Sequence, residues 1–226
     1  MSCSEVLFAN KQIVDNNLVI LSWGNVSKID RDKNILYIKP SGADLEQISE
    51  NDISQVFTLD GHWVRGMKPS VDTKIHLEIY KGFSDVGAVV HTHSVYATAF
   101  AQANKPIPCL GTTHADYFHG EIPCVPQPTV VELNDDYEKH TGLRIVDYFN
   151  HFGIDYNHVP AALVEGHGVF CWGKTIEDAV ETAIILEKVA EMAILTLSLN
   201  KDSNLSDYVL DKHFTRKHGD SKYYGQ

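Results

Sequence analysis

Hydrophobic positions in the first part of the chain switch between helical and strand-like spacing. Over residues 4–17, apolar side chains recur on one helical face, with Val6 and Ile13 seven positions apart, and this spacing predicts a helix. Short β-rich runs at 18–22, 35–39 and 54–58 predict strands. Gly24-Asn25 and Pro40-Ser41-Gly42 come after two of these runs and predict turns.

The remaining chain mixes helical and extended segments. We expect helices over 72–81, 95–103 and 138–152, a strand over 87–93, and short strands near 107–110 and 122–125. Two further strands flank a turn at Gly166-His167-Gly168. Thr175 is the predicted N-cap of a long helix that ends near residue 199, and a last helix begins at Ser206. This mixture predicts an α/β fold with helices on a sheet, although the spacing does not reveal strand direction.

Composition limits the classes of protein that fit. The 226 residues include 43% hydrophobic and 22% charged residues and contain no linker or repeat, so we expect one domain over 1–226. The net charge of −11 argues against nucleic acid or an anionic membrane as a partner. The four cysteines form no C-x-x-C pair, and the first residues do not resemble a secretory signal, which favours a cytoplasmic protein.

Histidine is unusually frequent, with 12 residues, and three of them have suggestive positions. In His91-Thr92-His93 two imidazoles lie on one face of a strand about 7 Å apart, as two ligands of one metal ion would; the alternative is a pair on a half-buried strand. His167 stands between two glycines, where it could equally be an ordinary turn residue. Three neutral histidines would form a catalytic zinc site with open positions. Asp72 could join them, or could simply cap the helix that starts at Thr73.

Five segments in this order resemble the class II, zinc-dependent sugar-phosphate aldolase and epimerase family, and in particular its L-ribulose-5-phosphate 4-epimerases. The resemblance runs from the first predicted helix to the last residues. It implies a single α/β/α domain with a central, mostly antiparallel sheet covered by helices, assembled into a homotetramer with active sites between subunits. The segments are Trp23-Gly24-Asn25-Val26-Ser27, Lys39-Pro40-Ser41-Gly42, Pro69-Ser70-Val71-Asp72-Thr73, His91-Thr92-His93-Ser94 and Gly111-Thr112-Thr113-His114-Ala115-Asp116-Tyr117.

The resemblance also assigns roles to individual residues. It implies one Zn²⁺ per subunit, held by His91, His93 and His167 with Asp72 beside them. Asp116 and Tyr224 of a neighbouring subunit would be the catalytic acid and base, and His213 would lie near them. The substrate phosphate would contact six residues, although these residues could also simply form ordinary turns. These residues are Gly24, Asn25, Ser41, Gly42, Ser70 and Val71. The family has a Ser-Ser pair before the aspartate, and its second residue is Val71 here.

The implied reaction interconverts L-ribulose 5-phosphate and D-xylulose 5-phosphate. The hydrogen on C4 is not alpha to the C2 carbonyl, so inversion by simple proton abstraction would give an unstabilised carbanion. Oxidation by a nicotinamide is disfavoured, because Gly166-x-Gly168 is followed by Cys171 where G-x-G-x-x-G requires glycine. Zinc-assisted retro-aldol cleavage of C3–C4 and re-addition remains. The alternatives are a class II aldolase that releases the fragments, which carries glutamate where Asp72 stands, and a zinc-stabilised module without activity.

Overall fold

A single sheet organises the molecule, which is described here as a computed structural model covering residues 2–219 and 222–223. Within these residues the sheet has eight strands in the order β4-β3-β2-β1-β5-β8-β7-β6. Each strand pairs antiparallel with its neighbour, apart from the parallel β6–β7 pair. The mostly antiparallel sheet is therefore confirmed. Its strands are β1 (Gly24–Asp30), β2 (Ile35–Ile38), β3 (Ser54–Phe57), β4 (Trp63–Arg65), β5 (Ala88–Thr92), β6 (Cys124–Val125), β7 (Ala161–Val164) and β8 (Gly168–Gly173).

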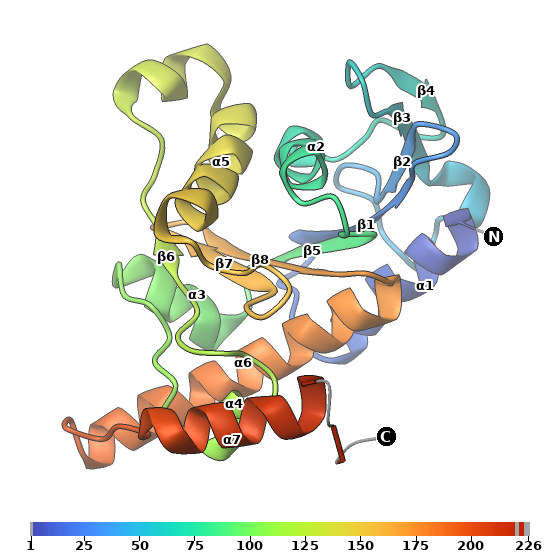
Figure 1. Cartoon of the computed structure of the whole chain (residues 1–226). Coiled ribbons are helices and arrows are strands. Elements are labelled where there is room, and N and C mark those ends of the chain that lie inside the picture. The colour runs from blue at the N-terminus through green and yellow to red at the C-terminus, as the bar shows by residue number, and fades with distance from the viewer. Residues whose placement is uncertain (1, 220–221, 224–226) are drawn as a thin grey trace.

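Helices cover both faces of the sheet, as the α/β prediction requires (Figure 1). On one face, α2 (Thr73–Gly82) packs closely against α5 (Val130–Phe152). On the other face lie α1 (Ser2–Asp15), α3 (Val95–Gln102) and the long α6 (Ile176–Leu199). Two further helices, α4 (Thr112–Ala115) and α7 (Asp207–His218), pack on each other beyond α6, and a short 3-10 turn, η1 (Glu50–Asp52), precedes β3.

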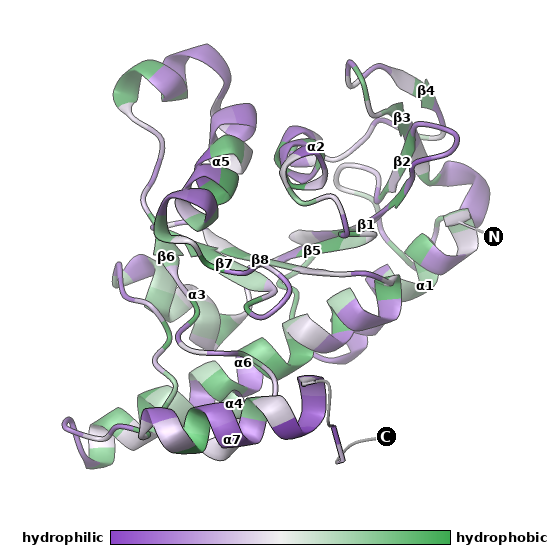
Figure 2. Cartoon of the chain, in the orientation of Figure 1, coloured by the Kyte–Doolittle hydropathy of each residue, from purple (hydrophilic) through white to green (hydrophobic). Residues whose placement is uncertain are grey.

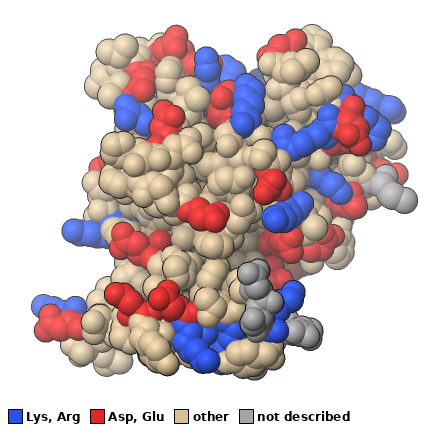
Figure 3. All heavy atoms as spheres, in the orientation of Figure 1, with Lys and Arg blue, Asp and Glu red and all other residues tan. Residues whose placement is uncertain are grey.

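Burial and capping explain why these segments form. Strands β5, β7 and β8 are mostly hydrophobic (Figure 2), and β5, β7 and most of β8 are buried. Thr175 caps α6 as predicted: its hydroxyl accepts from the Asp178 N–H, and the Asp178 carboxylate accepts from the Thr175 N–H. Acidic and basic side chains are interspersed over much of the face in Figure 3. Among the described helices, none has both the length and the hydropathy needed to cross a membrane.

Two local predictions were wrong. Residues 18–22 form no strand; Leu21 there is exposed and adopts a φ of 54°, which a strand does not allow. Gly24 and Asn25 are consequently not a turn but the first residues of β1. The helix expected at 138–152 is confirmed as the part of α5 that follows the non-helical Asp136, and the preceding segment from Val130 was not predicted.

Candidate metal centre

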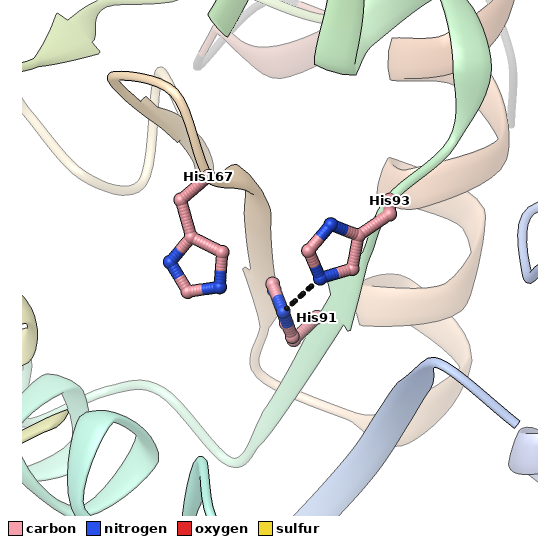
Figure 4. Close-up of side chains that lie close together, drawn as sticks. All are labelled: His91, His93 and His167. Carbon is pink, nitrogen blue, oxygen red and sulfur yellow. Dashed lines mark hydrogen bonds between the residues drawn. The ribbon is translucent and has the colours of Figure 1, made fainter. Parts of the chain in front are cut away.

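His91 and His93 come from β5 and its end at the middle of the sheet (Figure 4). Their Nε2 atoms lie 3.1 Å apart, so the expected same-face geometry is present. The ring of His91 is fully buried and stacks on Phe170 of the adjacent β8, with ring centroids 4.2 Å apart. This stacking fixes the first imidazole in a single orientation against the sheet.

His167 reaches the same place from the turn between β7 and β8 (Figure 4). Gly166 before it has a φ of +64°, in the left-handed region that glycine adopts readily. In consequence His91, His93 and His167 each offer one ligand atom, and these three atoms lie within 4.8 Å of one another. Among the described residues, the structure brings together the three histidines that the sequence singled out.

The other ring nitrogens are already engaged. His91 Nδ1 lies 2.8 Å from the Val169 carbonyl, and the ring of His93 bonds to the carbonyl of His167. His167 Nδ1 lies 3.1 Å from the hydroxyl of Tyr137 on α5. A carbonyl oxygen can only accept, so Nδ1 of His91 donates and its Nε2 keeps the lone pair for a ligand. The Tyr137 hydroxyl can accept from His167 Nδ1 in the same way.

Burial also keeps the histidines neutral. It lowers the pKa of His91 and His93 and brings the pKa of His167 to about 3, where the neighbouring imidazoles act in the same direction. Neutral imidazole is the form that binds a metal ion, and three such nitrogens with open positions are the donor set of a catalytic zinc site. The residues therefore fit a metal ion of this class.

Asp72 occupies the N-cap position of α2, yet its side chain makes no capping hydrogen bond. Instead its Oδ2 accepts from Asn25 Nδ2 at 2.7 Å and from Ser70 Oγ at 3.2 Å. Burial opposes ionisation of the carboxyl group, but the potential of His91 and His76 and the Asn25 bond bring its pKa below the usual value. The carboxylate is thus held by Asn25 and Ser70 in the wall of the cavity, outside the group of three histidines whose ligand atoms cluster, and the simple helix-cap alternative does not describe it.

A cavity of about 460 Å³ lies over this cluster, and every predicted metal-binding and phosphate-binding residue lines it. The amides divide into two groups. The N–H groups of Ser41 and Ser70 donate to the carbonyls of Lys68 and Lys39. Among the described residues, the N–H groups of Gly42 and Val71 have no hydrogen-bond acceptor. Gly42 and Val71 are therefore the main-chain donors free to meet an anion.

Five residues that line this cavity were not predicted as site residues: Ser22, Trp23, Lys39, Tyr137 and Glu138. Lys39 and Tyr137 have the most informative contacts. Lys39 is only 3% exposed, and its Nζ donates to the carbonyls of Ser22 at 3.1 Å and Pro40 at 3.4 Å rather than to a carboxylate. Burial lowers the pKa of its ammonium group. Lys39 could have been predicted as a phosphate-binding residue, because it stands in the same motif as Ser41 and Gly42. Nothing in the sequence connects Tyr137 with His167.

Asp116 lies elsewhere in the chain. It follows α4 and does not line the cavity. Arg216 Nη2 on α7 contacts both of its carboxylate oxygens at 2.9 Å, and His213 Nδ1 lies 2.9 Å from Oδ1. Burial alone would raise the pKa of the Asp116 carboxyl group. The hydrogen bonds to Arg216 and His213 lower this pKa by a larger amount, so the net shift is downward. Tyr224 falls outside the described residues. Within the described residues of one chain, Asp116 and the histidine cluster do not form one site.

The fold and the histidine cluster agree with a family assignment. A family model described as "Class II Aldolase and Adducin N-terminal domain" matches residues 4–194, and the chain belongs to this family. It is 44% identical over 224 residues, covering 98% of this chain and 97% of the relative, to the L-ribulose-5-phosphate 4-epimerase UlaF of Salmonella paratyphi C (strain RKS4594). The family resemblance drawn from the motifs is thereby confirmed.

Solved structures agree on the fold. An L-fuculose 1-phosphate aldolase superposes with a TM-score of 0.80 at 24% identity, covering 94% of this chain and 93% of that one. The L-fuculose-1-phosphate aldolase of Thermus thermophilus gives a TM-score of 0.70 at 18% identity, covering 90% and 97%. At such identities the likeness establishes a shared architecture, and function has to be argued from the site.

Proposed function

We propose that the protein is a zinc-dependent isomerase that interconverts L-ribulose 5-phosphate and D-xylulose 5-phosphate by retro-aldol cleavage and re-addition at C3–C4. The observation that carries the proposal is the single cavity in which three neutral histidines and Asp72 stand beside free main-chain donors and a buried lysine. A full-length relative named as this epimerase supports the choice of substrate.

Different residues of the cavity would bind the sugar and the phosphate of the substrate. His91, His93 and His167 would hold the zinc ion, with Asp72 beside them; when bound, zinc supplies Lewis-acid polarisation of the substrate oxygens. The N–H groups of Gly42 and Val71 and the hydroxyls of Ser41 and Ser70 would bind the phosphate. Lys39 would add a positive charge, and Gly24 and Asn25 would form the adjoining wall. The cavity would thus bind the sugar oxygens at its metal-binding end and the phosphate at its other end, which suits a sugar phosphate.

Asp72 favours the epimerase over an aldolase that releases its products. Its carboxylate is tied to Asn25 and Ser70, which directs it along the wall of the cavity. Aspartate is one methylene shorter than the glutamate of the sibling aldolases, so it has less reach toward the carbon skeleton. Proton transfer to and from the oxygen on C4 would then fall to groups supplied from outside the chain.

Asp116 and Tyr224 are the proposed groups, contributed by a neighbouring subunit of a cytoplasmic homotetramer, with His213 beside Asp116. A complementation experiment tests this arrangement. The variants His93→Asn and Asp116→Asn should each be nearly inactive alone. Co-expressed in equal amounts, they should regain about a quarter of the wild-type activity, because half of the positions combine with half of the neighbours to give intact sites. Hybrids as inactive as each variant alone would contradict shared sites.

The reaction itself is tested by product analysis. Zinc-loaded protein incubated with L-ribulose 5-phosphate should yield D-xylulose 5-phosphate, identified by ³¹P and ¹³C NMR. Accumulating glycolaldehyde phosphate and dihydroxyacetone would identify an aldolase instead. If neither appears while zinc is bound, the proposed substrate is wrong.

A further inference from the structure

We infer that Tyr137 is a positioning residue of the metal centre, which fixes the ring of His167 so that Nε2 faces the other two histidines. The inference rests on the proposed metal site. The cluster is asymmetric: the rings of His91 and His93 are held by main-chain carbonyls, those of Val169 and His167. His167 is held by a side chain, the hydroxyl of Tyr137 at 3.1 Å from Nδ1.

His167 has the greatest need of such a partner. His91 is immobilised by stacking on Phe170 inside the sheet, whereas His167 stands on a turn that includes the exposed Gly166. Figure 4 shows one of its ring nitrogens directed toward His91 and the other directed away from the cluster. With Nδ1 bonded to Tyr137, Nε2 is the inward nitrogen. A half-turn of the ring would exchange them, and the hydroxyl resists that rotation.

The chain positions Tyr137 by interrupting α5. Asp136 has a non-helical backbone, with φ −155° and ψ 88°, and its Oδ1 accepts from the Lys139 N–H. Asp136 therefore caps the second segment of the helix, and Tyr137 is its first residue. Lys74 on α2 anchors this cap through an ion pair of 2.7 Å with Asp136 Oδ2. Asp72 directly precedes α2 and Tyr137 lies on α5, so this pair of helices positions two of the residues that line the cavity.

A close helix contact holds this register. Gly142 on α5 faces α2, where a Cβ atom would lie 2.8 Å from the Ile75 carbonyl oxygen. The hydroxyl of Thr141, the residue before Gly142, donates to the Tyr137 carbonyl one turn earlier at 2.8 Å. Tyr137 is thus supported from its cap, its own backbone and the neighbouring helix, as a residue must be if it is to orient another side chain.

The test is Tyr137→Phe, which keeps the ring and removes the hydroxyl. Outer hydrogen-bond partners of metal-bound histidines typically account for tenfold or greater changes in affinity, and we expect zinc to bind about tenfold more weakly in competition with a chelator. In the metal-free protein, ¹⁵N spectra should show His167 losing its single Nδ1–H tautomer. Tyr148→Phe is the matched control: Tyr148 lies on the same helix but packs on Phe152, and both readouts should stay unchanged.

The variant His167→Gln separates this inference from the proposed function. If it does not weaken zinc binding, the metal site itself is wrong. If it does, while Tyr137→Phe keeps wild-type affinity and a wild-type His167 tautomer, only the role of Tyr137 is overturned. Far-UV circular dichroism of each variant checks that the fold is intact, and restored affinity in Tyr137→His, which can again offer a polar atom, would further support positioning.

Discussion

Each histidine of the cluster offers one nitrogen because the other is already hydrogen-bonded. Two of these bonds end on the backbone and one on a side chain, so most of the geometry is built into the sheet. Asp72 and Asn25 follow the same principle, since the half-buried carboxylate before α2 is held in place by an amide from strand β1. The individual residues are therefore arranged before any ligand arrives, which reduces the cost of binding.

The role of the buried Lys39 charge in binding the phosphate can be tested by substitution. The variant Lys39→Met removes the buried charge but keeps most of the stem. Charge-assisted hydrogen bonds contribute roughly 1.5–3 kcal/mol, so kcat/KM for the sugar phosphate should fall about 10- to 150-fold. Steady-state kinetics and a zinc titration should be measured together. Zinc affinity should stay at the wild-type level, and an unchanged kcat/KM would remove Lys39 from the phosphate site.

Helices α2 and α5 approach each other closely at Gly142, which faces the backbone of Ile75. Gly142→Ala would place a methyl group 2.8 Å from the Ile75 carbonyl oxygen and 2.8 Å from Glu78 Cβ. Overpacking of this kind costs about 1–3 kcal/mol, and urea denaturation should show the loss. Gly111→Ala is the control, because no atom lies within 4 Å of its added Cβ and its backbone is extended. Equal stability of the two variants would contradict the close helix contact.

Sequence periodicity predicted most helices, and it placed His91 and His93 on one face because alternation along a strand is a local property. Contacts between distant segments were beyond its reach. The helix-cap alternative for Asp72 failed because Asn25, 47 positions away, takes the carboxylate. Gly24-Asn25 read as a turn since a strand beginning with glycine carries no propensity signal. The Tyr137–His167 contact spans 30 residues and had no local signature.

The whole molecule carries several histidines that burial keeps neutral. Burial lowers the pKa of His76 to about 3 and that of His114 to about 4, although the Gly120 carbonyl opposes the second shift. The ordinary histidine pKa is near 6.5, so below it the unfolded chain binds protons that the folded chain does not. Stability is therefore full above about pH 6.5 and is lost as the pH falls from there toward these lowered values.

This linkage predicts an acid-sensitive fold. Between pH 6 and pH 5, each such histidine should lower the free energy of unfolding by about 1.4 kcal/mol per pH unit at most. Urea titrations of metal-free protein at pH 7.5, 6 and 5 measure the slope. His114→Asn should give a shallower slope whatever its absolute stability. A free energy of unfolding that stays constant from pH 7.5 to pH 5 would contradict neutral burial.

The most direct measurement of the central claim follows the hydrogen on C4 during turnover in D₂O. Cleavage and re-formation of the C3–C4 bond leave that hydrogen on its carbon. Zinc-loaded protein should therefore convert L-ribulose 5-phosphate to D-xylulose 5-phosphate without deuterium at C4, and chelated protein should convert none. Deuterium at C4 of the product, or full activity after the metal is removed, would contradict the account.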